Sequence, residues 1–392
     1  MFRMAVGHSD DIDIDAALIA VFQQCDAALA GATPRAGIIF GAWDIDHEAL
    51  VSGVRRHYPG IELAGATTAG EMSSVIGFSE DSVALAVFAS DGVEITAGIG
   101  RNLRADPAEA TRHAVATARS KATQPSRLCL VMPTIGGAEA GLIFDGLRAA
   151  LGPGVPVVGG GASPEDPAAT LGATESRQIV NDEVTRDSIA ILLFSGDVDF
   201  SFGVETGWQG VGPRGIVTRI SPDGVLEIDG LPAIDFYARY LGTGQPPIAN
   251  PLAVYEGDGS GSDRFYLRTP INWDPETGRV GFFGAVPEGA IVQITVAGTE
   301  QIFEGARASM QDALAAYPAG KTPDAALLYS CATRRFLLGT RVGREVEMIR
   351  DLLGTSIPIA GMYCLGEIAP MASPDRTQFH NATMVSVLLG AS

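Results

Sequence analysis

The chain has 392 residues, 46% of them hydrophobic, which is enough for about two or three domains with large buried cores. Its formal net charge is −19, and the clustered basic residues that nucleic-acid binding requires are missing. No apolar run approaches the roughly 20 residues of a spanning helix and the N-terminus has no signal-peptide pattern, so we expect a cytoplasmic protein without nucleic-acid or membrane partners.

The first copy of a repeated strand–helix–strand unit lies near the start of the chain. An apolar strand, 37–40, and a helix near 47–57 precede a second strand, 61–64, which leads into a glycine-rich turn. A further apolar strand, 81–88, follows the turn. The turn reads Gly65-Ala66-Thr67-Thr68-Ala69-Gly70-Glu71.

The second copy is looser. Asp106 and Pro107 form a cap and a first-turn proline, which together predict a helix to about residue 120. A strand over 128–131, a helix around Leu147 and a strand over 155–158 then lead to three consecutive glycines.

Between residues 198 and 296 the pattern changes to short strands broken by Gly, Pro and Asp, with one helix that begins at Pro232. The segment 242–262 is rich in Gly, Pro and Ser, and we expect it to be a surface excursion.

The third copy closes the chain. Strands over 325–329 and 357–360 flank a helix near 344–353, and the turn 361–367 is followed by a strand over 382–389. The first and third turns both spell Ala-Gly-x-x-x-x-Gly-Glu. The whole pattern predicts an α/β protein of repeated β-α-β units in two parts, with a β-rich region at the start of the C-terminal half.

The glycine-rich turns place backbone N–H groups at the ends of core strands, where α/β proteins commonly bind ligands. The first and third turns are therefore candidate sites for a carboxylate or another anion. The alternative is that the glycines only permit tight turns and close packing. Glu71 and Glu367 follow equivalent turns, where each either braces its loop, which is the commoner use, or receives a ligand amino group.

Taken together, these motifs resemble the FIST family over nearly the whole chain. The family often has Cys in the position of Ala66, so any role of that thiol is absent here. The matching segments are 64–71, 156–162, 207–212, 325–334, 361–368 and 380–383.

The resemblance implies an N-terminal FIST domain, 1–200, and a C-terminal FIST domain, 201–392. Members of the family are thought to bind small ligands and to signal to histidine kinases, cyclic-di-GMP enzymes or chemotaxis receptors. A subset of stand-alone members binds haem and responds to nitric oxide through a partner kinase. This chain is similar in length to that stand-alone form.

Several chemically active side chains belong to the C-terminal motifs. The fold should bring Cys331, Arg334, Tyr363 and His380 together from three segments. Arg334 either holds a carboxylate or a haem propionate, or pairs with an acidic neighbour. Cys331 and His380 would suit a hydrolase, but nothing in their spacing supplies an oxyanion hole, so we expect binding without catalysis.

Haem iron requires a His, Cys, Tyr or Met ligand. His47, His57 and His113 fall on polar faces or ends of predicted helices, where we expect solvent, so His8 and His380 are the candidate iron ligands. The candidate ligand-binding residues are Gly65, Ala66, Thr67, Thr68, Gly70, Glu71, Cys331, Arg334, Tyr363, Cys364, Glu367, His380 and Asn381.

The sequence therefore predicts a cytoplasmic ligand-sensing protein that regulates a partner histidine kinase or cyclic-di-GMP enzyme. One form of this prediction is a haem-based nitric oxide sensor, and the alternative is direct binding of an amino acid or another metabolite. The ligand is expected in a cleft lined by the turns 65–71 and 361–367. A Cys331/His380 hydrolase is the least favoured hypothesis.

Overall fold

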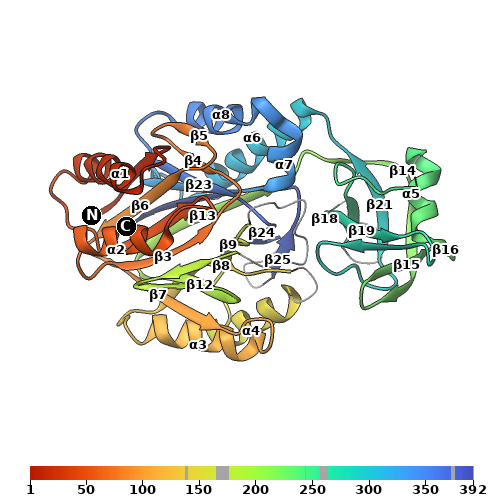
Figure 1. Ribbon diagram of the computed structural model, residues 1–392, viewed down its shortest axis with the longest axis horizontal. Coiled ribbons are helices and arrows are strands. Elements are labelled where there is room, and N and C mark those ends of the chain that lie inside the picture. Colours follow the sequence, from red (N-terminus) through yellow and green to blue (C-terminus); the bar gives the residue numbers. More distant parts are fainter. Residues whose placement is uncertain (137–139, 165–175, 243, 257–263, 372–375, 392) are drawn as a thin grey trace.

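The computed structural model describes residues 1–136, 140–164, 176–242, 244–256, 264–371 and 376–391. Three six-stranded sheets form a body, and an eight-stranded sheet forms a separate module at one end of the longest axis (Figure 1). Each sheet of the body contains a parallel β-α-β pair, which confirms the predicted α/β class. In the described part of the chain, no helix is both long and apolar enough to cross a bilayer.

The first sheet has the order β1-β6-β2-β3-β10-β11. Its parallel strands β2 and β3 are joined by α2, which Asp46 caps by accepting the backbone N–H of Ala49. The elements are β1 (Phe2–Ser9), α1 (Ile14–Leu29), β2 (Ala36–Gly41), α2 (His47–His57), β3 (Glu62–Thr67), β6 (Val83–Ser90), β10 (Gln178–Val180) and β11 (Glu183–Thr185).

The second sheet repeats this arrangement with the order β7-β12-β8-β9-β24-β25. Asp106 caps α3, as the sequence predicts, and α4 joins the parallel strands β8 and β9. The elements are β7 (Val93–Arg101), α3 (Pro107–Arg119), β8 (Ser126–Pro133), α4 (Ala140–Leu151), β9 (Val157–Gly160), β12 (Ser188–Gly196), β24 (Glu367–Pro370) and β25 (Thr377–His380).

The third sheet has the order β13-β26-β22-β23-β4-β5. Two helices and a 3-10 turn connect its parallel strands β22 and β23. The elements are β4 (Glu71–Ser73), β5 (Gly77–Ser79), β13 (Val198–Glu205), α6 (Thr299–Ala316), β22 (Ala325–Cys331), α7 (Ala332–Leu338), η1 (Gly339–Arg341), α8 (Gly343–Leu353), β23 (Ile359–Cys364) and β26 (Met384–Ala391).

Each sheet ends in a hairpin that belongs to another unit in sequence. The hairpin β4–β5 follows β3 but pairs with β23, β10–β11 follows β9 but pairs with β3, and β24–β25 follows β23 but pairs with β9. The exchange is cyclic, so segments on either side of residue 200 share two sheets. Separating the three units would break strand pairs in all of them.

The module is inserted between β13 and α6 of the third unit. The prediction that 242–262 is a surface excursion is wrong at β17, which is a buried strand whose apolar residues pack in the module. Residues 243 and 257–262 lie outside the described residues. The elements are β14 (Gln209–Ser221), β15 (Gly224–Ile228), β16 (Leu231–Pro232), α5 (Ala233–Leu241), β17 (Leu252–Tyr255), β18 (Phe265–Arg268), β19 (Pro270–Asp274), β20 (Arg279–Phe282) and β21 (Ile291–Val296).

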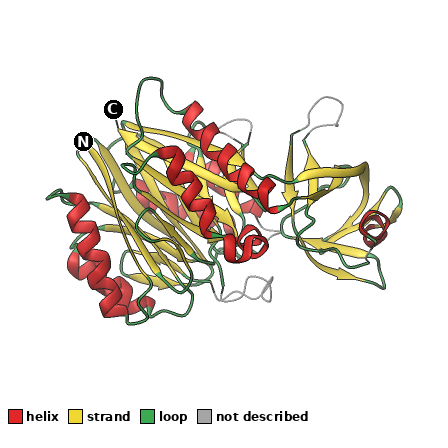
Figure 2. Cartoon of the chain, turned by 90° about the horizontal axis from the view of Figure 1, so that it is seen from above, coloured by secondary structure: helices red, strands yellow, loops and turns green. Residues whose placement is uncertain are grey.

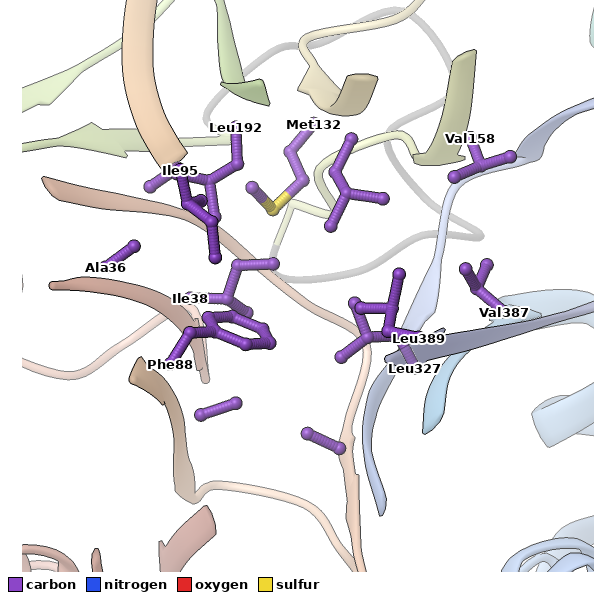
Figure 3. Close-up of a cluster of buried hydrophobic side chains, with 14 of the residues drawn as sticks. Ala36, Ile38, Phe88, Ile95, Met132, Val158, Leu192, Leu327, Val387 and Leu389 are labelled. Carbon is purple, nitrogen blue, oxygen red and sulfur yellow. The ribbon is translucent and has the colours of Figure 1, made fainter. Parts of the chain in front are cut away.

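The inner faces of the three sheets meet in one apolar core. Ile38, Met132 and Leu327 come from the first, second and third sheets, and all three are fully buried in the same cluster (Figure 3). The rings of Phe88 and Phe194 lie 5.7 Å apart across the first and second sheets. Helices cover the outer faces of the body, which Figure 2 shows from above, so each of the three sheets of the body is covered on both sides.

A glycine occupies the same place in the second parallel strand of each unit because the neighbouring strand leaves no room for a side chain. An added Cβ would lie 2.5 Å from Ile39 O at Gly65, 2.0 Å from Val131 O at Gly159 and 2.4 Å from Leu328 O at Gly361. These glycines therefore serve close strand packing, whatever else the turns do.

Candidate functional site

The first residue of each exchanged hairpin is a buried acceptor for a hydroxyl group at the start of the last strand of its own unit. In each pair the hydroxyl donates to a side-chain oxygen, so the hairpin is anchored to the unit that it follows in sequence. The distances are 2.5 Å from Ser82 Oγ to Glu71 Oε2, 2.9 Å from Ser188 Oγ to Gln178 Oε1 and 2.6 Å from Thr383 Oγ1 to Glu367 Oε2.

Glu71 belongs to a buried chain of hydrogen bonds that reaches His8. Thr68 Oγ1 and Ser82 Oγ donate to the Glu71 carboxylate. His8 Nε2 lies 2.8 Å from Ser82 Oγ, and His8 Nδ1 lies 2.7 Å from Ser73 Oγ. Because Ser82 gives its proton to Glu71, Nε2 donates and Nδ1 accepts. Burial raises the pKa of Glu71 to about 7 and lowers the pKa of His8 to about 4.

Glu367 lies beside two buried cysteines at the ends of β22 and β23. Its carboxylate accepts the backbone N–H and the hydroxyl of Thr383, and Cys364 Sγ lies 3.5 Å from its Oε1. Cys331 and Cys364 are partners in the parallel pairing. Burial raises the pKa of both thiols, and the Glu367 charge raises it further, which disfavours the thiolate that a nucleophile needs.

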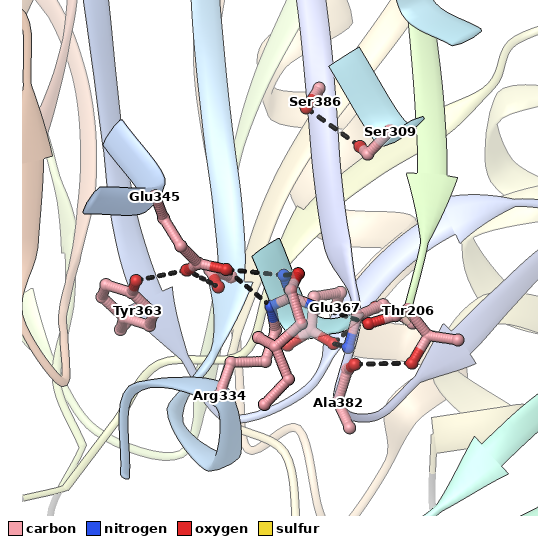
Figure 4. Close-up of polar contacts among 11 residues, drawn as sticks. Thr206, Ser309, Arg334, Glu345, Tyr363, Glu367, Ala382 and Ser386 are labelled. Carbon is pink, nitrogen blue, oxygen red and sulfur yellow. Dashed lines mark hydrogen bonds and ion pairs between the residues drawn. The ribbon is translucent and has the colours of Figure 1, made fainter. Parts of the chain in front are cut away.

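Arg334 is fully buried and paired inside the protein (Figure 4). Its Nε and Nη2 donate to Glu345 Oε1 at 3.1 and 2.5 Å, and the Tyr363 hydroxyl donates to the other carboxylate oxygen. Nη1 and Nη2 also donate to the carbonyl oxygens of Thr206 and Ile302 at 2.6 and 2.7 Å. The guanidinium considered for a ligand carboxylate therefore has an acidic neighbour within the fold.

Backbone hydrogen bonds join the first and third turns. Ala69 N donates to Tyr363 O, and Tyr363 N donates to Gly70 O, each at 2.8 Å. Thr67 Oγ1 donates to Ser163 O at 2.6 Å. A ligand between the first and third turns would have to break the two backbone bonds of Tyr363. The candidate residues of the first turn, Gly65, Ala66, Thr67, Thr68, Gly70 and Glu71, are all buried, and so is Ala69.

A pocket of about 380 Å³ lies where the module meets the body. Residues 202–206 of the body and 264–267 of the module line it, together with Asp312, His380 and Thr383. In Figure 1 the module faces β24 and β25 of the body across this boundary. Of the candidate residues, His380 is the one that the described lining includes.

His380 presents a hydrogen-bond acceptor to this pocket. Its Nε2 lies 3.0 Å from the carbonyl oxygen of Ala369, and since a carbonyl only accepts, Nε2 carries the proton and Nδ1 is left to accept. Burial lowers the pKa of His380 to about 4, so the ring is neutral. The neighbouring Asn381 accepts the backbone N–H of Thr269 at 2.9 Å and thereby ties the module to the body.

Two family models match successive parts of this chain. The FIST N domain covers residues 35–231, and the FIST C domain covers residues 233–370. The chain belongs to the FIST family. FIST domains are small-ligand-sensing domains of signal transduction, so the family resemblance seen in the sequence is confirmed at this level.

Relatives of this FIST protein match a shorter segment. An uncharacterized protein of Mycobacterium tuberculosis is 32% identical over 124 residues, which are 32% of either chain. One of Mycobacterium bovis is 30% identical over 124 residues, 32% of this chain and 31% of that protein. The chain thus matches about a third of the length of these relatives.

Solved structures give only a weak likeness. A cyanuric acid hydrolase from A. caulinodans has 11% sequence identity and a TM-score of 0.35, with 100% of this chain and 99% of that chain covered. PurLQS from Thermotoga maritima has a TM-score of 0.23 at 10% identity, with 100% and 72% covered. Likeness at this level says nothing about the function of the FIST protein.

The residues considered for haem do not fit an iron site. Both ring nitrogens of His8 are bonded to serine hydroxyls, and Arg334 is held by Glu345 rather than facing a propionate. His380 offers only Nδ1, from a ring that is 2% exposed. Neither His8 nor His380 is therefore a prepared ligand for haem iron.

Sequence reasoning missed three residues. Glu205 and Asp312 line the pocket, but they are 107 positions apart in the sequence, and only the packing of α6 on β13 brings them together. The prediction that His47 lies in solvent is wrong, because its side chain is fully buried. Its Nδ1 accepts a hydrogen bond at 2.9 Å from Arg177, the residue before strand β10 of an exchanged hairpin. The sequence of one strand–helix–strand unit does not show which residue of another unit will contact it.

Proposed function

We propose that this FIST protein is a direct sensor of a small molecule that binds in the pocket between the body and the module. The observation that carries the proposal is that both parts contribute lining, residues 202–206 and His380 from the body and 264–267 from the module. The volume of about 380 Å³ falls near the lower end of the range of ligand pockets, about 300–1,000 Å³, and suits a metabolite such as an amino acid.

Ligand binding at this place would be coupled to the position of the module. Near the pocket, Arg268 Nη1 donates to Phe379 O at 2.8 Å and Thr269 N donates to Asn381 Oδ1 at 2.9 Å. A ligand that touches both parts binds one arrangement of them better, and it therefore shifts the population towards that arrangement. A cytoplasmic partner, a histidine kinase or a cyclic-di-GMP enzyme, would then read the changed surface.

The proposal includes binding without catalysis. Cys331, the nucleophile of the hydrolase hypothesis, is a buried thiol whose pKa burial raises. We expect the Cys331→Ala variant to bind ligand as the unaltered protein does. Loss of a measurable hydrolysis of the bound metabolite in this variant would support the hydrolase instead.

Trp208 provides the test of coupling. It is 2% exposed at the start of the module, where its Nε1 donates to Ala249 O at 3.0 Å. In a protein with Trp43→Phe and Trp273→Phe, metabolites that raise the melting temperature should also shift Trp208 emission. No thermal shift across a panel of amino acids and other metabolites would contradict sensing, and a thermal shift with unchanged emission would contradict the coupling.

A haem titration separates direct binding from the haem-based alternative. Because both ring nitrogens of His8 are hydrogen-bonded to serine hydroxyls, we expect absorption spectra without a saturating Soret band. A band that saturates at one haem per chain and shifts with nitric oxide would favour a haem-based nitric oxide sensor over direct metabolite binding.

A further inference from the structure

The body side of the pocket carries two carboxylates that the ion pairs of the described residues leave unneutralised. Glu205 ends β13, and Asp312 lies on α6. The ion pairs on these two elements use other carboxylates, Asp199 with Lys321 and Glu304 with Arg307. The pocket therefore holds uncompensated negative charge on this side.

Glu205 and Asp312 are close enough to influence each other. Glu205 is half-buried, and burial raises the pKa of its carboxyl, with a second contribution from the negative charge of Asp312. A cation bound between the Glu205 and Asp312 carboxylates would reduce the repulsion between them, and it would do so more strongly because Glu205 is partly shielded from water.

A cation at this place would be organic rather than a metal ion. In the parts of the chain that the structure describes, no group of three or more His, Cys, Asp or Glu side chains could hold a metal. Phe202 and Phe265 add apolar surface to the lining, which a hydrated metal ion would not use.

Positive charge lies on the module side. Arg264 lines the pocket and is itself exposed. Arg268, which follows the lining residue Leu267, is buried, and its guanidinium donates to the carbonyl oxygens of Ala285 and Phe379 at 3.0 and 2.8 Å. This separation of charge orients a ligand with its cationic end on the body, away from Arg264.

His380 adds a second polar requirement. It is 2% exposed, its ring lines the pocket, and Nδ1 is the nitrogen left to accept a hydrogen bond. A buried acceptor of this kind is satisfied by a hydroxyl or N–H donor on the ligand.

We infer that the pocket takes a small organic amine, protonated at neutral pH, with its ammonium group at Glu205 and Asp312, an apolar middle, and a hydrogen-bond donor that reaches His380. This inference rests on the proposed function and names the class of its ligand. Tyramine has all three features, and tyrosol is its neutral analogue, with a hydroxyl in place of the ammonium group.

Calorimetric titration of the full chain with both compounds tests the inference. Tyramine should bind about tenfold to a hundredfold more tightly than tyrosol, the ratio expected for a charge-assisted hydrogen bond. The Glu205→Gln and Asp312→Asn variants should each weaken tyramine binding by about tenfold and leave tyrosol unchanged. Glu300→Gln, an exposed change on the same helix as Asp312, is the control and should alter neither affinity.

Three outcomes would overturn the inference. They are equal binding of tyramine and tyrosol, tighter binding of the anion phenylpropanoate than of tyramine, and tyramine binding that neither Glu205→Gln nor Asp312→Asn weakens. Since Glu205 is half-buried and Asp312 exposed, both isosteric variants should fold, which their melting temperatures check. If only neutral or anionic metabolites stabilise the protein, the amine class fails while the proposed sensing stands; if no metabolite does, the proposed function fails.

Discussion

Removal of Glu345 should destabilise the protein more than removal of any exposed carboxylate on α8. In Glu345→Ala, Arg334 would keep its charge at 0% exposure but lose the carboxylate that accepts from Nε and Nη2 at 3.1 and 2.5 Å. The Tyr363 hydroxyl would lose its acceptor as well. Breaking one side of a buried ion pair costs about 3–5 kcal/mol, and we expect Glu345→Ala to lower the free energy of unfolding by this amount.

The remaining acceptors decide where in that range the loss falls. Arg334 keeps hydrogen bonds to the carbonyl oxygens of Thr206 and Ile302, so part of its charge stays solvated by the backbone. The double variant Arg334→Met with Glu345→Gln removes both charges. It should lose less stability than Glu345→Ala, because no unpaired charge stays buried.

Urea unfolding at neutral pH measures these differences, and Glu347→Ala is the matched control. Glu347 lies two positions further along the same helix and is exposed, so its removal should change the free energy of unfolding by no more than about 0.5 kcal/mol. If Glu345→Ala and Glu347→Ala unfold at the same urea concentration, Arg334 does not depend on a buried partner, and the reasoning is refuted.

Two further predictions concern the repeated turns. The pKa of Glu71 is about 7 in the fold against an ordinary 4.5, so the folded state binds the extra proton and stability is lost as pH rises from about 4.5 to 7. Glu71→Gln, which copies Gln178 of the second unit, should therefore shrink the fall in stability between pH 5 and pH 8 by up to about 3 kcal/mol in urea titrations; an unchanged fall would place the proton elsewhere. Gly361→Ala should destabilise by about 2 kcal/mol or more because its Cβ would lie 2.4 Å from Leu328 O. Gly141→Ala, with open space at its Cβ, should be neutral or stabilising by up to about 1 kcal/mol; urea unfolding of both glycine variants measures the difference, and equal effects of the two changes would contradict the packing argument.

Local pattern was sufficient for much of the architecture. The helices α2 and α3 begin at caps that are visible in the sequence, because an aspartate side chain accepts the N–H of a residue three positions later. The three strand–helix–strand units were visible as well, since each crossover helix and each apolar strand is formed by consecutive residues with a recognisable hydrophobic pattern. The excursion predicted over 242–262 failed at β17, where a short run of four buried residues carries too weak a signal against a background of Gly and Pro.

The candidate site was predicted less completely. The equivalence of Glu71 and Glu367 follows from two identical turn patterns, and both side chains accept hydroxyl groups at the same place in their units. The partner of Arg334 was not identified, although Glu345 is only eleven positions away, because three acidic residues lie on α8 and only packing selects one. Glu205 and Asp312 had no common sequence signal at all.

The sequence by itself determined the α/β class, the three repeated units, the FIST family and the positions of most helices, because each depends on residues close together in the chain. Only the tertiary structure decided the cyclic exchange of hairpins, the internal pairing of Arg334 and the pocket between module and body. Those features depend on which distant segments share a sheet edge or a buried volume. That choice is made by the combined burial of three sheets in one core, and no single segment encodes it.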